Sequence, residues 1–91
     1  MKFIAVHPLE SPITKDQITE AARACRAENS NDAYWVDSWT QLNDKGEITV
    51  IYCQYDAKDA NSISNLLKKG APDLPVDGIY PMGKLESEDY R

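Results

Sequence analysis

Residues 34–57 read YWVDSWTQLNDKGEITVIYCQYDA and predict a β-hairpin with apolar or aromatic side chains on both of its faces. Successive side chains of a strand point to opposite faces, so we expect Trp35 and Trp39 on one face and Val36 on the other. Residues 43–46 tolerate positive φ and can close the turn. A one-sided antiparallel sheet would show a polar face, and this hairpin shows none.

Length, composition and charge limit the class of protein. A chain of 91 residues is one domain, because two halves would each be too small to bury a core. We place the domain at residues 1–84 and an acidic tail at residues 85–91. A net charge of −5 argues against nucleic acid or membrane as partner, since both require a basic patch. No apolar run is long enough for a membrane span or a signal peptide, so we expect a cytoplasmic protein.

A strand and a helix are expected before the hairpin. Residues 2–7 alternate and stop at Pro8, and a proline-rich loop should follow through Pro12. Thr14 and Gln17 have the spacing of a capping box, which begins a helix. Apolar side chains of this helix recur on one face, at Ile18, Ala21, Ala22 and Cys25.

A second helix and a short strand are expected after the hairpin. Asp56 is the predicted cap of the helix, Gly70 ends it, and Pro81 puts the final strand, residues 76–82, at a sheet edge. The order β-α-β-β-α-β is that of a ferredoxin-like α+β fold, a four-stranded antiparallel sheet with both helices on one face. The inner side of the second helix carries Ala60, Ile63, Leu66 and Leu67.

Two helices on one side of a sheet leave its other side bare. Because the hairpin is apolar on both faces, we expect two copies to stack sheet against sheet in a homodimer of the dimeric α/β-barrel kind. The alternative is a monomer with a shallow hydrophobic groove, although monomers rarely expose large apolar patches.

The blocks WVDSW at residues 35–39 and IYCQYDA at residues 51–57, followed by GAP at residues 70–72, carry a family resemblance. With these blocks the chain resembles the nickel-binding-protein-like family of small bacterial proteins, formerly a domain of unknown function, from the first strand to the last. The resemblance implies a ferredoxin-like fold, a dimer and, in some members, nickel binding. Members often carry histidine where Asp37 stands, whereas His7 is the single histidine here.

Nickel or another transition metal takes imidazole, thiolate and carboxylate ligands, so the candidate ligands are His7, Cys53 and Asp37. The hairpin places Asp37 and Cys53 opposite each other on one face, with Cys53 toward the far end of its strand from His7. Each residue also has a simpler interpretation. The ring of His7 can be hydrogen-bonded to a loop carbonyl, Cys53 can pack in the core, and Asp37 can lie at the solvent-exposed margin of the sheet.

Two functions of different class remain open. The first is a non-catalytic dimer that binds a transition metal or a small-molecule ligand weakly. The second is a small-molecule enzyme of the isomerase, cyclase or cofactor-free monooxygenase type, which rests on analogy between folds. Its candidate acid–base residues, which a dry pocket would activate, are Asp37, His7 and Tyr55. The candidate ligand-binding residues are Trp35, Trp39 and Tyr52.

Overall fold

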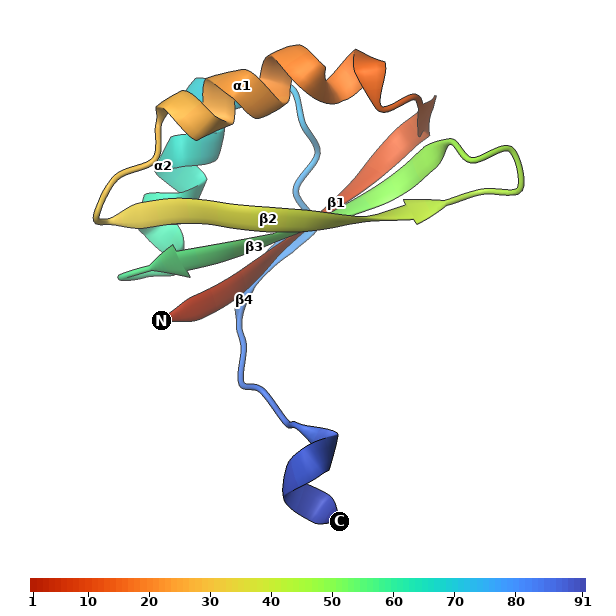
Figure 1. Cartoon of the computed structure of the whole chain (residues 1–91). Coiled ribbons are helices and arrows are strands. Elements are labelled where there is room, and N and C mark those ends of the chain that lie inside the picture. The colour runs from red at the N-terminus through yellow and green to blue at the C-terminus, as the bar shows by residue number, and fades with distance from the viewer.

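The computed structural model describes all 91 residues and confirms the predicted ferredoxin-like α+β fold (Figure 1). The sheet is antiparallel throughout with strand order β2-β3-β1-β4, and both helices lie on one side of it. None of the helices has the length and hydropathy that a membrane-spanning helix needs. The elements are β1 (Lys2–Ile13), the 3₁₀ helix η1 (Asp16–Ile18), α1 (Thr19–Ala27), β2 (Ala33–Leu42), β3 (Ile48–Ala57), α2 (Ala60–Gly70), β4 (Gly78–Pro81) and the 3₁₀ helix η2 (Ser87–Tyr90).

The turn between β2 and β3 forms where the sequence predicts it. The side-chain oxygen of Asn43 accepts hydrogen bonds from the backbone N–H groups of Lys45 and Glu47, both at 3.0 Å. Gly46 has a φ of 76°, which glycine adopts without steric strain. The side chain of Asn43 thus satisfies two backbone donors of the turn.

The two tryptophans do not share a face, which corrects the sequence-based expectation. The pairing of β2 with β3 skips Val36, which lies between the paired residues Trp35 and Asp37. Such an extra residue is a β-bulge, and it reverses the alternation of all the side chains that follow. Trp35 therefore faces the helices, and Trp39 faces the opposite side.

The first strand is longer than predicted. β1 continues through Pro8, which is opposite Val50, and ends at Ile13, which is opposite Ile48. The register shifts between those two pairs. Proline cannot donate to a sheet and is tolerated where the pairing is irregular, so the expected proline-rich loop is instead an irregular end of β1.

The start of α1 is only partly as expected. The backbone N–H of Thr14 donates to the side-chain oxygen of Gln17 at 2.7 Å, which is one half of the predicted capping box. The chain first makes one 3₁₀ turn, and the α-helix begins at Thr19. The first turn of the predicted helix is therefore the separate element η1.

The N-cap of α2 is Asp59, whose carboxylate accepts a hydrogen bond from the backbone N–H of Ser62 at 2.8 Å. The predicted cap, Asp56, lies in β3 because this strand continues to Ala57. The two candidates are three residues apart, and only the end of the strand decides between them.

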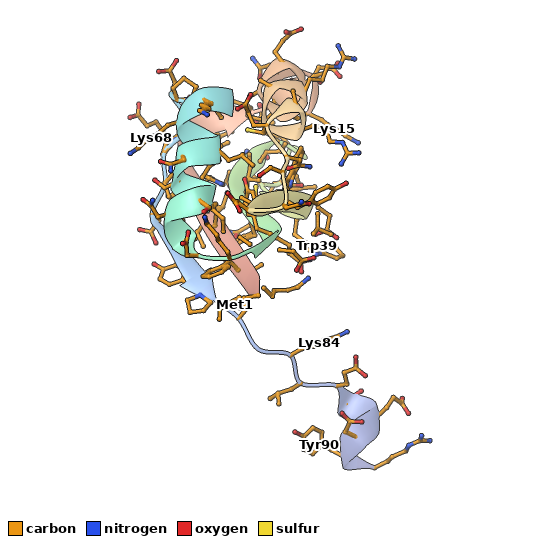
Figure 2. The ribbon with its side chains drawn as sticks, turned by 90° about the vertical axis from the view of Figure 1, so that its left-hand side faces the viewer. Met1, Lys15, Trp39, Lys68, Lys84 and Tyr90 are labelled. Carbon is orange, nitrogen blue, oxygen red and sulfur yellow. The ribbon has the colours of Figure 1, made fainter.

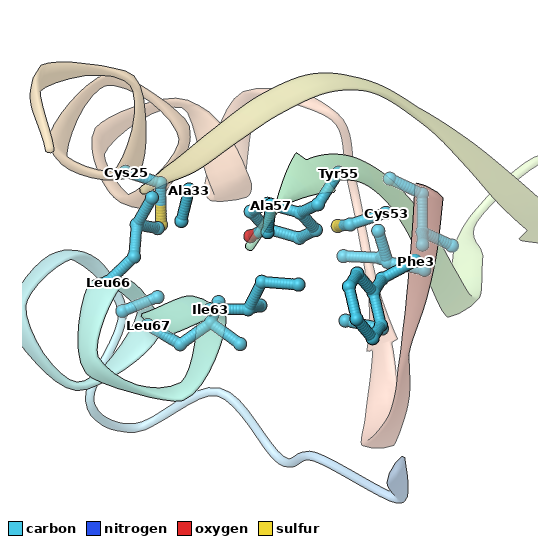
Figure 3. Packing of buried hydrophobic residues seen from close by; sticks show 13 residues of the cluster. Phe3, Cys25, Ala33, Cys53, Tyr55, Ala57, Ile63, Leu66 and Leu67 are labelled. Carbon is cyan, nitrogen blue, oxygen red and sulfur yellow. The ribbon is translucent and has the colours of Figure 1, made fainter. Parts of the chain in front are cut away.

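The core lies between the sheet and the helices, and the predicted inner stripe of α2 supplies much of it (Figure 3). Ile63, Leu66 and Leu67 are buried as expected. The two helices also touch at backbone level, since a Cβ atom on Gly70 would lie 2.7 Å from the Cα atom of Cys25. Glycine at the end of α2 therefore sets how closely α1 can approach.

Candidate functional site

The two sides of the sheet carry different side chains. We call the side under the helices the covered face and the other side the open face. The covered face is built from buried residues of β1 and β3, namely Phe3, Ala5, His7, Ile51, Cys53 and Tyr55. The open face is built from residues that alternate with these and their partners, chiefly Ile4, Val6, Trp39, Tyr52, Gln54 and Tyr80.

An aromatic and apolar row crosses the centre of the open face. Trp39 is paired with Tyr52 across β2 and β3, and Tyr52 is paired with Val6 across β3 and β1. The side chain of Trp39 is 70% exposed, and it lies away from both helices (Figure 2). A large exposed indole beside further apolar groups is typical of an interaction surface.

Asp37 and Cys53 lie on opposite faces, which corrects the predicted pair. The bulge at Val36 puts Ser38, not Asp37, opposite Cys53. Asp37 is exposed, and its carboxylate accepts a hydrogen bond from the side-chain nitrogen of Gln54 at 2.7 Å. It therefore lacks the dry surroundings that the acid–base hypothesis requires.

A cavity of about 500 Å³ lies between α1 and the covered face of β2 and β3. Its helix wall carries Ala21, Ala22 and Cys25, and its sheet wall carries Ser38 and Cys53. Protein interiors are normally close-packed, but the side chains that α1 turns toward the sheet are small. The space beneath α1 is therefore a consequence of residue size on the helix wall.

A hydrogen-bond chain fixes the polar groups of this cavity. The indole N–H of Trp35 donates to the hydroxyl of Ser38 at 2.9 Å, and that hydroxyl donates to the sulfur of Cys53 at 3.0 Å. Burial raises the pKa of the Cys53 thiol to about 11. Burial also raises the pKa of Tyr55, so both groups stay protonated and uncharged at neutral pH.

His7 is fully buried on the covered face, and its ring is already engaged. The nitrogen Nδ1 lies 2.8 Å from the carbonyl oxygen of Pro75, so it carries the proton and donates. The other nitrogen, Nε2, has no hydrogen-bond partner, and burial lowers the pKa of the ring. This confirms the interpretation of a histidine bonded to a loop carbonyl. His7 and Cys53 are opposite Ile51 and Ala5, so they are closer than the sequence predicts.

The candidate ligands do not fit a nickel ion within one chain. No group of three or more histidine, cysteine and acidic side chains is arranged to hold a metal ion. Asp37 lies across the sheet from Cys53, and metals bind the thiolate, which burial disfavours here. The candidate set is therefore divided between two faces.

Residues 3–82 match the model of one protein family, described as nickel responsive protein SCO4226-like. The chain belongs to this family. The match confirms the family resemblance, because it spans the sheet and both helices. No curated protein and no solved structure matches the chain. The description of the SCO4226-like family concerns a response to nickel, whereas the geometry of this chain supplies an apolar cavity and an open apolar face.

Sequence reasoning missed Ser38, Lys15 and Ala22 as parts of a site. Their common feature is that they line the cavity beneath α1. A signal was present, since α1 has alanine and cysteine where a core helix usually carries larger residues. It could not be interpreted without knowing that the bulge turns Ser38 toward the helix.

Proposed function

We propose that this chain is a non-catalytic binding protein that works as a homodimer paired through its open face. The row of Val6, Tyr52 and Trp39 carries the proposal, because it places an indole that is 70% exposed at the centre of an uncovered sheet. In a single copy this row is exposed to water, and soluble monomers seldom expose an apolar patch of this kind.

The size of the open face favours a second copy as its occupant. Three strands of ten residues or more cover roughly 500 Å² in projection at the usual strand spacing and rise, before side chains add relief. A stable interface buries about 800 Å² on each partner. The relief of the side chains and the short strand β4 add to the projected area, so a sheet that pairs with its own copy about a twofold axis approaches this value with one patch.

The open face carries little net charge. Lys2 and Asp56 lie opposite each other with their charged atoms 3.9 Å apart, and of these three charged groups only Asp37, whose carboxylate accepts a hydrogen bond from neutral Gln54, is not paired with an opposite charge. The net charge of −5 is therefore carried mainly elsewhere on the chain. Each large side chain buried in the interface contributes roughly 1.5–3 kcal/mol, before the cost of association.

Sedimentation equilibrium of the full chain and of Trp39→Asp tests the dimer. We expect the natural chain to be a dimer at micromolar concentration and the variant to be a monomer with unchanged far-ultraviolet circular dichroism. Leu85→Asp is the matched control, since Leu85 is as exposed but lies in the tail beyond β4. A monomeric natural chain, or a dimeric Trp39→Asp, would overturn the proposal.

For nickel, to which the family name refers, we propose that this chain binds Ni²⁺ weakly. The donors of one chain do not converge, and the open face offers carboxylate and amide oxygens instead of the imidazoles that Ni²⁺ prefers. Calorimetric titration of the untagged dimer should show Ni²⁺ uptake only at large excess. Tight stoichiometric binding, or no uptake at any excess, would contradict this part of the proposal.

A binding role is favoured over the enzyme of the dimeric α/β-barrel kind. The candidate acid–base group Asp37 is exposed, and His7 is fully buried, bonded to the carbonyl of Pro75, and outside the lining of the cavity. Tyr55 does line the cavity, but burial raises its pKa, whereas a general base needs a pKa near the working pH.

A further inference from the structure

The cavity beneath α1 has a buried end and an exposed rim. Cys25, Cys53 and Tyr55 line its buried end. Lys15 and Leu42, which are exposed, line its rim (Figure 2 shows Lys15 on the helix side of the sheet). A molecule can therefore enter from solvent without unfolding the helix.

The size and surface of the cavity fit a small organic molecule. A volume of about 500 Å³ lies within the range of roughly 300–1,000 Å³ that ligand pockets occupy. It would hold on the order of 15 water molecules, but most of its lining is apolar and offers water few partners. Apolar groups of a ligand fill such a space better than water does.

The cavity is positively charged at its rim and uncharged at its buried end. Lys15 is the only charged residue that lines the cavity, and it lies at the rim. The thiols and the phenol at the buried end are neutral, and the hydroxyl of Ser38 is held by Trp35 and Cys53. An anionic group is therefore favoured at the rim and disfavoured at the buried end.

We propose that the cavity binds a small amphipathic carboxylate, with its apolar body beneath α1 and its anionic group beside Lys15. This inference deepens the binding role proposed above and rests on it. The cavity and the open face lie on opposite sides of the sheet, so each can be tested without disturbing the other.

Calorimetric titration with octanoate and with 1-octanol tests the site. In the variant Trp39→Phe, the emission of Trp35 becomes a local probe, because the chain has two tryptophans and Trp35 lines the cavity. We expect both probes to bind and to shift this emission. Ala22→Leu places three more carbon atoms in the cavity directly beneath α1 and should weaken binding of both probes at least tenfold. Ala24→Leu is the matched control, because Ala24 lies on the exposed side of α1.

The role of the rim has its own test. Lys15→Gln should weaken octanoate about two- to fivefold, as expected for an exposed ion pair, and should leave 1-octanol unchanged. Equal losses for both probes, or none for octanoate, would overturn the anionic part of the proposal. Should Ala22→Leu fold poorly, Ala21→Leu serves instead, since Ala21 lines the same wall.

Two results would overturn the site as a whole. One is the absence of octanoate binding to the natural chain. The other is undiminished binding by a folded Ala22→Leu or Ala21→Leu, which would place the probe elsewhere, such as on the open face. Sedimentation of the same samples reports the dimer separately, so failure of the cavity and failure of the dimer give different results.

Discussion

The covered and open faces of the sheet differ in how far their apolar side chains are buried within one chain. Along β1, Ala5 is fully buried under the helices, whereas its neighbour Val6 is only partly covered. The covered face contributes buried and mostly apolar side chains, Tyr55 among them, to the core and the cavity, whereas the open face leaves Trp39 and part of Tyr52 exposed. In the proposals above, apolar side chains of one sheet therefore contact different partners, a ligand on the covered side and a second copy on the open side.

A charge placed on each face in turn should affect the protein in two different ways. Ala5→Lys buries an ammonium group in the core at a cost of several kcal/mol, which is comparable to the whole stability of a small domain. We expect this variant to be unfolded. Val6→Lys should fold normally but weaken the dimer by about 10²-fold or more, as judged by circular dichroism and sedimentation. A folded Ala5→Lys, or an intact dimer of Val6→Lys, would contradict the assignment of the faces.

Gly70→Ala probes the packing above the covered face. The added Cβ atom would lie 2.7 Å from the backbone of Cys25, so α1 must move. Overpacking of this kind lowers the free energy of unfolding by about 1–3 kcal/mol. Denaturant unfolding measures the loss, and Gly83→Ala, with open space around it, should change stability by less than about 0.5 kcal/mol. An increase in stability, as helix propensity alone would give, would refute the close contact.

His7 should make the covered face sensitive to pH. Burial holds its folded-state pKa below the ordinary value of 6.5, so the unfolded chain binds a proton that the folded chain excludes. Its contribution to stability is complete above about pH 6.5 and is lost as pH falls below that value, with a slope of at most about 1.4 kcal/mol per pH unit. His7→Asn keeps a donor for the carbonyl of Pro75 and should remove this slope from urea unfolding measured between pH 7 and pH 5. The same slope in both proteins would be inconsistent with a titrating His7.

The C-terminal tail should contribute least to the free energy of unfolding. Residues 85–91 extend away from the domain (Figures 1 and 2), and their ion pairs, Lys84–Glu86 and Arg91–Glu88, join residues close together in the chain and none of the sheet or helices α1 and α2. Deleting residues 85–91 should change the free energy of unfolding by less than about 0.5 kcal/mol. A larger loss in thermal or urea unfolding would show that the domain depends on its tail.

Local signals in the sequence predicted most of the fold. The turn at Gly46 and the inner stripe of α2 with Ile63 were determined by residues close together in the chain. The edge position of β4, indicated by Pro81, was also confirmed. The dimer and the domain boundary at residue 84 stay predictions.

The candidate site could not be predicted from the sequence to the same extent. A single bulged residue, Val36, moved Asp37 away from Cys53 and turned Trp35 toward the helices. After a bulge, the face on which a side chain lies depends on the pairing with the neighbouring strand. The alternation within one strand no longer predicts it. The cavity depends on residues from α1 and two strands, a combination that no single periodicity reveals.

Acrylamide quenching of the two single-tryptophan variants shows whether the dimer forms through the open face. Trp35→Phe reports Trp39 on the open face, and Trp39→Phe reports Trp35 beneath α1. As protein concentration rises through the dimerisation range, Trp39 should become shielded from acrylamide while the quenching of Trp35 stays constant. Trp39 that remains as accessible in concentrated as in dilute solution would contradict a dimer formed through the open face.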